Sequence, residues 1–576
     1  MLTRWPLPSR RALAVTAAAL AAAGLAACSS STSSTPSGTQ SGNGSGTSAP
    51  ATSNQPALVM ESSPENSITR NFNPFTVTTP VYGMGPDGLI YEPLIQFNLA
   101  KPPENYPWLA TGFTWADGGK SITFAIRTGV KWNDGQPFTP DDVVFTYNLL
   151  KANKAINLTG LQITSVSASG NNVTITFPSS QYMNLQNVAT PAILPKHIWS
   201  SVSDPTTYVD AKAVGTGPYV VSNFNSQGIT LGANPSYWQP VPVKKVFFPV
   251  YTSNTGATNA LFAGQIDWTG NFIPGLKENF VNKDPAHNSF WMAPNATNAL
   301  FPNLNRWPTN QLPVRQAISA AIDRTAIGTQ GEAGLEAPAS NATGLTLPTF
   351  AAWSGPVASM SLKATADAAS ATQILTKAGY KKDAAGFFAL NGKEVKLTIV
   401  DPAPYTDYAQ SCQIIAQQLK AVGINATFSG LTVDAWNAAV AAGTFDMTIH
   451  WGNGGITPYS LYSNWLDSRL AVGNNATGDY ERLNDPKVNA MLDKLTGDQT
   501  VEQQTADLVP IMQYVAANLP VIPTVNSAAW FESSSKHFTG WPTEANPYES
   551  GQPSGSNNNT GTGTDEVVIL HLKPVS

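Results

Sequence analysis

The sequence has 576 residues, enough for roughly two to four domains. Hydrophobic residues make up 42 % of it and support a buried core, whereas charged residues make up only 12 %, well under the ~25 % of an average soluble domain. The formal net charge is −5 and no cluster of five basic residues occurs, which excludes the electrostatic footprint of a nucleic-acid-binding protein.

The N-terminus has the layout of an export signal. A basic segment that includes Arg10 and Arg11 precedes an apolar run at 12–23, which is too short to span a membrane as a stable helix. Small residues then lead to Cys28 in an order that resembles a lipobox, so we expect residues 1–27 to be removed and Cys28 to carry lipid. An ordinary cleavage site is the alternative, and the arginine pair leaves general secretion and twin-arginine export both open.

Residues 28–56 are rich in serine, threonine and glycine and carry no charge, which is typical of a flexible tether. The chain has two cysteines, Cys28 and Cys412, so lipidation of the first leaves no partner for a disulfide. Cys412 is expected to be a small buried apolar residue. No zinc-type cysteine–histidine spacing and no Gly-x-Ser-x-Gly motif occurs, and we predict no metal, no cofactor and no catalytic residue.

The folded body begins with a strand-like run at 58–60. A segment at 111–127, interrupted by an Asp-Gly-Gly-Lys turn, predicts a β-hairpin. Further on, Thr139, Pro140 and Asp142 form a pattern typical of a helix start, since the threonine can cap the first turn and the acid favours its positive end. Capping explains these polar residues better than a catalytic acid cluster does.

Strand-like and helix-like segments alternate in the second half of the chain. They are the strands 394–400, 424–428 and 445–449 and the helices 405–422 and 433–442. Such alternation predicts a parallel sheet, and ligands of parallel sheets sit beyond the carboxyl ends of strands. The glycine-rich loop at 451–459 and the Asp-Pro-Ala-Pro segment at 401–404 should therefore share one binding edge.

Several segments together resemble one known family. The most specific runs from Lys131 to Phe145, and others follow the family order at 108–110, 214–219, 234–238, 261–268, 314–324 and 374–380. These segments resemble the family-5 extracellular solute-binding proteins, the peptide- and nickel-binding components of ATP-binding-cassette (ABC) importers. The resemblance covers residues 57–576.

The resemblance implies an α/β fold of two lobes, the class II form of the periplasmic-binding-protein-like fold, with an extra α+β subdomain. Mapped onto this chain, the first lobe takes residues 57–90, 212–308 and 526–576, the extra subdomain 91–211 and the second lobe 309–525. The apolar segment 567–572 is expected to be a last strand that pairs with the first lobe.

The resemblance also bears on the ligand. In the family's peptide binders, an aspartate after the tryptophan of this edge pairs with the α-amino group of the peptide. Here the run from Trp451 to Pro458 keeps the tryptophan and the proline but has Gly454 at the aspartate position. A buried ammonium without a counter-charge is costly, whereas an uncharged edge suits hydroxyl-rich ligands. The expected ligand is a peptide or peptide-like solute, with a neutral oligosaccharide as the alternative.

Within this framework, Trp451 and Asn453 are expected to contact the ligand, supported by Trp268, Trp436 and Tyr459. Trp268 would reach the ligand from the opposite lobe. The alternative is that Trp451 is a core aromatic and that the glycines only form a tight turn.

The implied partners are a small solute and the membrane permease of the importer. The implied protein is a monomer, held by a lipid anchor on the outer face of the cytoplasmic membrane. It has no nucleic-acid partner and no enzymatic activity. A lipoprotein outside transport, either a signalling receptor or an enzyme, is the remaining alternative.

Overall fold

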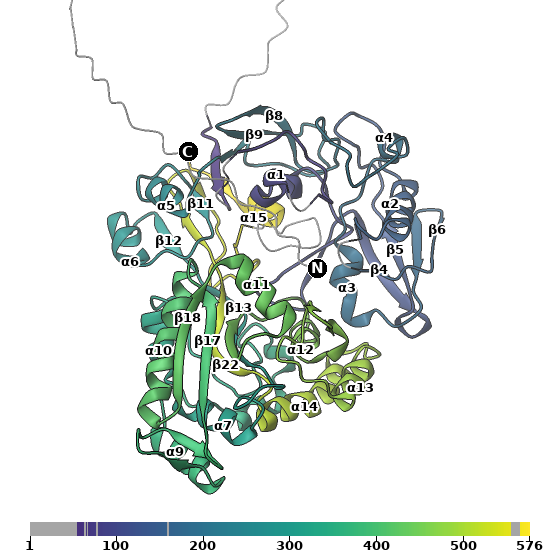
Figure 1. The fold of residues 1–576 in the computed structure, drawn as a ribbon. Helices are drawn as coiled ribbons and strands as arrows, with labels where there is room; N and C mark the ends of the chain where they lie inside the picture. The colour runs from purple at the N-terminus through teal and green to yellow at the C-terminus, as the bar shows by residue number, and fades with distance from the viewer. Residues whose placement is uncertain are drawn as a thin grey trace, which may run out of the picture. The chain divides into compact units, whose positions relative to one another are not determined.

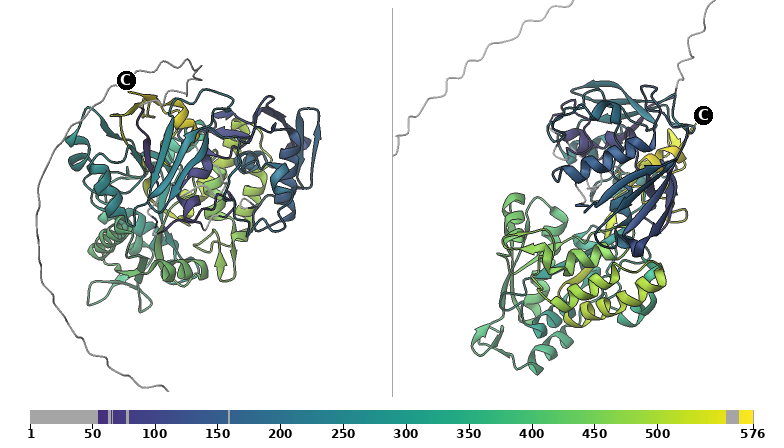
Figure 2. Two further views of the ribbon diagram at one scale, coloured as in Figure 1. Left: turned by 90° about the horizontal axis from the view of Figure 1, so that it is seen from above. Right: turned by 90° about the vertical axis from the view of Figure 1, so that its right-hand side faces the viewer.

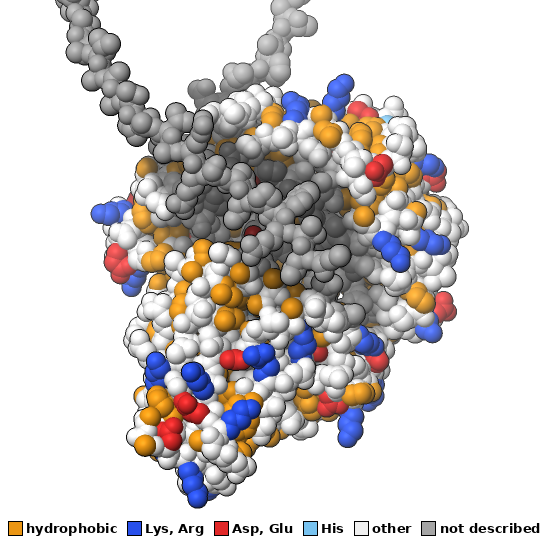
Figure 3. Space-filling model, viewed as in Figure 1, with side chains coloured by type: hydrophobic (Ala, Val, Ile, Leu, Met, Phe, Trp, Pro, Cys, Tyr) orange, Lys and Arg blue, Asp and Glu red, His pale blue; other side chains and the backbone are white. Residues whose placement is uncertain are grey.

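The computed structural model describes residues 55–62, 65, 67–76, 79–157, 160–553 and 565–575. The predicted signal peptide, Cys28 and nearly all of the tether lie outside these residues. None of the helices in the described part is both long and apolar enough to cross a membrane. On the face drawn in Figure 3, charged side chains are scattered among uncharged ones, in keeping with the low charged content of the chain. Acidic and basic side chains are interspersed there.

A mixed sheet forms the centre of the first lobe (Figure 1). Its strands, in spatial order, are β12 (Asn288–Phe290), β23 (Glu532–Ser534), β11 (Trp268–Thr269), β1 (Leu58–Glu61), β10 (Lys245–Pro249), β9 (Gly228–Ala233) and β8 (Tyr219–Asn225). β1 is parallel to both of its neighbours, so the carboxyl ends of β1, β10 and β11 lie at one edge. Three helices of this lobe are α1 (Pro80–Met84), α5 (Asn254–Phe262) and α6 (Leu276–Asn279).

The extra subdomain is built on an antiparallel sheet. Its strands are β4 (Ala110–Ala116), β5 (Ser121–Ile126), β7 (Asn172–Thr176) and β6 (Ser165–Ser169). The pairing of β4 with β5 confirms the predicted hairpin. The helix start is also confirmed, because α2 (Pro140–Ala152) begins with a capping box in which the Asp142 carboxylate accepts the Thr139 N–H at 2.9 Å. Short helices α3 (Leu185–Ala189) and α4 (Lys196–Trp199) follow.

The second lobe holds a second sheet. Its strands, in spatial order, are β18 (Asn425–Leu431), β17 (Lys396–Pro402), β19 (Met447–His450), β13 (Ala293–Pro302) and β22 (Ile522–Ala529). The predicted alternation is confirmed, because β17 is parallel to β18 and β19 and the chain passes between them through α10 (Thr406–Val422) and α11 (Val433–Ala442). Cys412 is fully buried on α10, as predicted. Further helices are α7 (Leu312–Ala321), α9 (Ala368–Lys377), α12 (Tyr459–Leu466), α13 (Pro486–Leu495) and α14 (Val501–Asn518).

Two segments join the lobes, and they lie side by side. One leads from β12 into β13 and the other from β22 into β23. They are hydrogen-bonded neighbours, because Ala293 lies opposite Ala529 and the Trp291 N–H donates to the Phe531 carbonyl at 3.0 Å. The structure thus places β13 in the second lobe, whereas the boundary at residue 309 assigned it to the first. The residues of a strand do not show which sheet the strand joins. The predicted boundary between the lobes therefore lies too far along the chain, after β13 instead of before it.

The C-terminal segment 567–572 is helical, and the prediction of a strand there is wrong. It belongs to α15 (Asp565–His571), and only the short β25 (Lys573–Pro574) after it pairs, with β24 (Phe538–Thr539). A short apolar run fits a buried helix as well as a buried strand, and the acidic residues Asp565 and Glu566 favour a helix N-terminus. The left view of Figure 2 shows this helix, in yellow, beside strands of the first lobe.

Candidate functional site

The glycine-rich loop begins at the end of β19, directly beside the end of β17. Val400 and Thr448 pair in parallel register, so Asp401 and Ile449 reach the same edge of the sheet. The buried Asp401 carboxylate accepts the Ile449 N–H at 2.9 Å and the Thr448 hydroxyl at 3.2 Å. Burial raises the pKa of Asp401 to about 7. The predicted shared edge is confirmed, and Asp401 ties its two strand ends together.

Trp451 is the exposed aromatic of this edge. Its side chain is 37 % exposed, and the only other large apolar side chains that are exposed among the described residues are two valines, Val209 and Val575. The structure therefore does not place Trp451 in the core. An exposed aromatic face at the carboxyl end of a parallel strand is a surface on which a ligand can stack.

Two buried rings support Trp451 from one side. The His450 ring lies 4.2 Å from the Trp451 ring at an interplanar angle of 34°, and the Trp436 ring lies 5.4 Å from His450 at 22°. Trp436 is 1 % exposed, and its indole N–H donates to the Thr448 hydroxyl at 2.8 Å. Burial lowers the pKa of His450 to about 4, so this ring is neutral at physiological pH. The support beneath Trp451 is therefore rigid and uncharged.

Gly454 lies against Asn295 of β13. A Cβ atom at Gly454 would lie 2.4 Å from the Asn295 side-chain oxygen and 3.1 Å from the Asn295 carbonyl oxygen. Asn295 itself lies at a register shift between Pro294 and Ala296, a bulge that turns its side chain toward the loop. A side chain at position 454 therefore requires the Asn295 side chain to move, and the loop carries no carboxylate at this position.

The other predicted ligand contacts differ in their surroundings. Asn453 is exposed in the loop, and Tyr459 is half-buried at the start of α12. Trp268 is fully buried in β11, where its indole N–H donates to the Gly551 carbonyl at 2.7 Å. Trp268 therefore offers no surface to a ligand in this conformation, and Trp436 supports Trp451 without being exposed itself.

Buried carboxyl groups lie behind this edge. Glu332 accepts the Ser411 hydroxyl at 2.7 Å, and Glu336 accepts the Asn298 side-chain amide at 2.9 Å. Burial, and next the charge of Asp407, raises the pKa of Glu332 to about 8, and burial also raises the pKa of Glu336 well above its ordinary value. No group of three or more His, Cys, Asp or Glu residues in the described ranges is arranged to hold a metal ion.

The strand ends of the first lobe are also polar. Glu61, at the end of β1, accepts the Thr269 hydroxyl at 2.6 Å and the Asn271 side-chain amide at 2.8 Å. Glu61 and Glu532 are buried, and burial raises the pKa of both carboxyls. Asn271 is half-buried and is the more accessible member of this cluster.

The loop after Trp451 interlocks with the extra subdomain. Ile456 is 5 % exposed and belongs to the hydrophobic cluster of the first lobe and subdomain, which includes Val188 of α3. In the reverse direction, Met183 of the subdomain belongs to a cluster of the second lobe. The Ser180 hydroxyl also donates to the Thr496 carbonyl of the second lobe at 2.6 Å.

Sequence reasoning missed Asn295, His450 and Tyr480. The Tyr480 ring lies 4.6 Å from the His450 ring at an interplanar angle of 33°. His450 adjoins Trp451 in the sequence, so its proximity was visible, but its burial and neutrality were not. Asn295 and Tyr480 come from distant segments and carry no motif that marks them.

The fold and this edge define a two-lobed α/β binding protein of the periplasmic type. Residues 104–471 match the sequence pattern of "Bacterial extracellular solute-binding proteins, family 5 Middle", and the chain belongs to this family. Its members bind solutes, so the protein is a solute-binding protein and not an enzyme.

Similar proteins include binding proteins for different ligands. The nickel-binding periplasmic protein of Escherichia coli is 27 % identical over 380 residues, which cover 63 % of this chain and 70 % of that one. Protein XP55 of Streptomyces lividans is 27 % identical over 435 residues, covering 72 % and 77 %. A periplasmic oligopeptide-binding protein of an ABC transporter from Thermotoga maritima is 26 % identical, with a TM-score of 0.79 over 90 % of this chain and 99 % of that one. The same protein bound to mannohexaose gives a TM-score of 0.72 over 90 % and 98 %.

Proposed function

We propose that the protein captures an extracytoplasmic solute for an ABC importer and that this solute is uncharged where it meets Trp451. The observation that carries the ligand class is the absence of a carboxylate at position 454, beside the exposed ring, where Gly454 packs against the side chain of Asn295 instead. Because His450 is neutral and Asp401 is buried and hydrogen-bonded, neither offers a charge to the ligand. Recognition here rests on stacking and on uncharged hydrogen-bonding groups.

A neutral oligosaccharide fits these features best. Sugar rings stack on aromatic faces, and hydroxyl groups match the carboxamides of Asn453 and Asn295 because both donate and accept hydrogen bonds. The mannohexaose complex of the Thermotoga maritima protein shows that a relative with this fold binds such a ligand. A peptide is the second candidate, favoured by the several relatives that are oligopeptide-binding proteins, but its amino terminus would need another counter-charge.

The two ligand classes respond differently to charge, which gives the first test. We expect neutral oligosaccharides of four to six units to raise the melting temperature of the protein, since a ligand at 100 times its Kd adds about 2.7 kcal/mol to stability. Peptides are compared in free and N-acetylated forms. A peptide that binds tightly only with a free amino group would contradict an uncharged site.

The anchoring proposal concerns the N-terminus. We propose that Cys28 carries lipid, that the protein is a monomer on the outer face of the cytoplasmic membrane, and that it delivers its solute to a permease there. Cys28→Ser is expected to move the protein from the membrane fraction into the culture fluid, because one polar side chain then replaces the acyl chains. Immunoblots of both fractions measure the shift, and a variant that stays with the membrane to the same degree contradicts the lipid anchor.

A further inference from the structure

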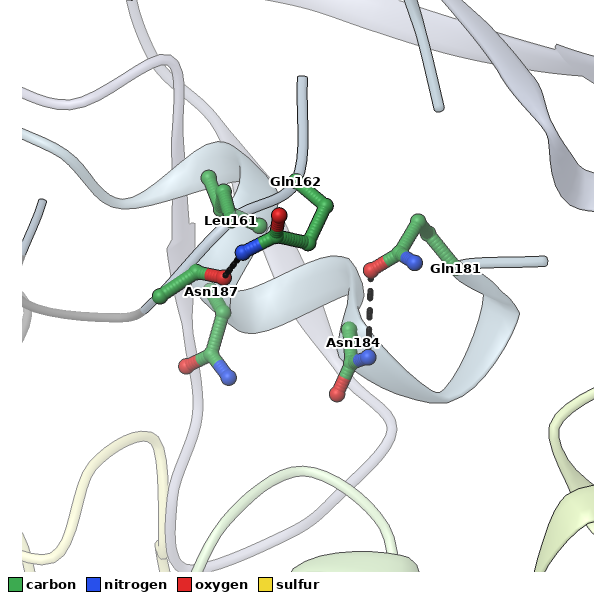
Figure 4. A pocket seen from close by; sticks show the side chains of 6 residues that line it. Leu161, Gln162, Gln181, Asn184 and Asn187 are labelled. Atoms are coloured by element: carbon green, nitrogen blue, oxygen red, sulfur yellow. Dashed lines mark hydrogen bonds between the residues drawn. The ribbon is translucent and has the colours of Figure 1, made fainter. Parts of the chain in front are cut away.

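A small pocket lies in the extra subdomain, away from the strand ends described above (Figure 4). It is lined by Gly160, Leu161, Gln162, Gln181, Asn184 and Asn187, which come from the segment after α2 and from the turn η3 (Tyr182–Asn184) and helix α3. Its volume is about 170 Å³. That is several times the ~30 Å³ that one water takes up in the liquid, but below the ~300–1,000 Å³ of pockets that hold a whole small ligand. The pocket therefore suits one unit of a longer molecule.

The lining is polar and carries no charge. Four carboxamides surround the opening, and Leu161, which is 6 % exposed, is its one large apolar lining residue. Figure 4 shows two bonds that hold this arrangement: the Gln162 amide donates to the Gly160 carbonyl at 3.1 Å, and the Asn184 amide donates to the Gln181 carbonyl oxygen at 3.1 Å. A carboxamide presents both donors and acceptors, so such a lining matches neighbouring hydroxyl groups and offers no counter-charge to an ion.

The helix that lines the pocket also contacts the loop that carries Trp451. Gln186 lies between Asn184 and Asn187 on the pocket segment, and its side-chain oxygen is 3.4 Å from the position of a Cβ atom at Gly455. Gly455 follows Trp451 by four residues in the same loop. A ligand that stacks on Trp451 and continues along this loop thus reaches the helix that forms one wall of the pocket.

We propose that this pocket is a subsite that receives one neutral, hydroxyl-bearing unit, a single monosaccharide residue, of an oligosaccharide whose other part stacks on Trp451. The proposal rests on the function proposed above and extends it to ligand length. A ligand too short to span from the Trp451 edge to α3 leaves the pocket empty, whereas a longer ligand fills it and gains its hydrogen bonds.

Filling the pocket with an apolar side chain tests this subsite. Binding of neutral manno-oligosaccharides of two to six units is measured by calorimetry on the purified full chain and on Asn187→Leu. We expect the variant to bind the six-unit ligand about tenfold more weakly, or ~1.4 kcal/mol, and to bind the two-unit ligand within twofold of wild type. Asn148→Leu is the matched control, an exposed asparagine of α2 outside the pocket, and should change neither affinity.

The possible outcomes distinguish failure of the proposed subsite from failure of the proposed function. Equal losses for short and long ligands, or no loss for the long ligand, overturn the subsite and leave the proposed function in place. A wild-type chain that binds none of these oligosaccharides overturns both. If Asn187→Leu does not fold, as judged by its melting curve, Gln162→Leu on the opposite wall gives the same test from an exposed position.

Discussion

Replacing Trp451 with alanine is expected to weaken ligand binding by about 30-fold while leaving the fold intact. An aromatic anchor that becomes desolvated on binding is often worth ~2 kcal/mol, which is about 30-fold in Kd. Its side chain is 37 % exposed, so its loss from the free protein opens no buried cavity. Calorimetry with mannohexaose gives the affinity, and denaturant unfolding of the same samples gives the stability.

Trp436→Ala is the matched comparison, because it removes the same side chain from the buried layer beneath. Trp436 is 1 % exposed and donates to Thr448, so its loss should cost ~3–5 kcal/mol of stability, as for other buried tryptophans. The two variants thus distinguish a residue that supports the fold from one that contacts the ligand. A Trp451→Ala variant that loses comparable stability, or that binds as tightly as wild type, would show that the ligand site lies elsewhere.

The free energy of unfolding is expected to fall between pH 6 and pH 9, and it should fall less in the Glu332→Gln variant than in the wild type. The folded pKa of Glu332 is about 8, above the ~4.3 of an unfolded glutamate, so the folded state holds its proton more tightly. The stabilising contribution is complete below pH ~4 and is lost as pH rises toward 8. Between pH 6 and pH 8 the loss of stabilisation from this one carboxyl amounts to ~2–3 kcal/mol.

Denaturant unfolding at pH 6 and pH 9 measures this difference. The groups around Glu332 are Glu336, Asp401 and Asp407, whose pKa values are also raised. The wild type should therefore lose more stability over this pH range than Glu332 alone accounts for. The exposed Glu502→Gln on α14 serves as a control and should lose as much as wild type. Identical losses in wild type and Glu332→Gln would show that this carboxyl does not govern alkaline stability.

Local motifs predicted individual elements because their packing does not depend on distant partners, whereas the two-lobed arrangement was implied by the family resemblance. Thr139 and Asp142 cap α2 through local bonds, and the strands on either side of α10 and α11 follow from local periodicity. The same reasoning placed Trp451 at a strand end and predicted the burial of Cys412.

What the sequence could not predict depends on tertiary contacts. Trp268 follows a strand just as Trp451 does, yet it is fully buried because Gly551 and Trp541 come from the far end of the chain to cover it. The contact between Asn295 and Gly454 joins segments far apart in the sequence through a bulge that no local pattern marks. The helix α15 stands where a strand was predicted for a different reason, because a short apolar run fits a buried helix and a buried strand equally well.

The side-by-side crossings of the two lobes also limit how this protein can change over evolution. Since the segments through Trp291 and Phe531 are hydrogen-bonded to each other and lead into the paired strands β13 and β22, an insertion into one shifts its register against the other unless the second lengthens to match. Such a shift would turn every side chain of β13 over, including Asn295 beside the loop of Gly454. New specificities should therefore arise by exchange of side chains at the sheet edge and by changes in the subdomain loops, with the length of both crossings kept constant.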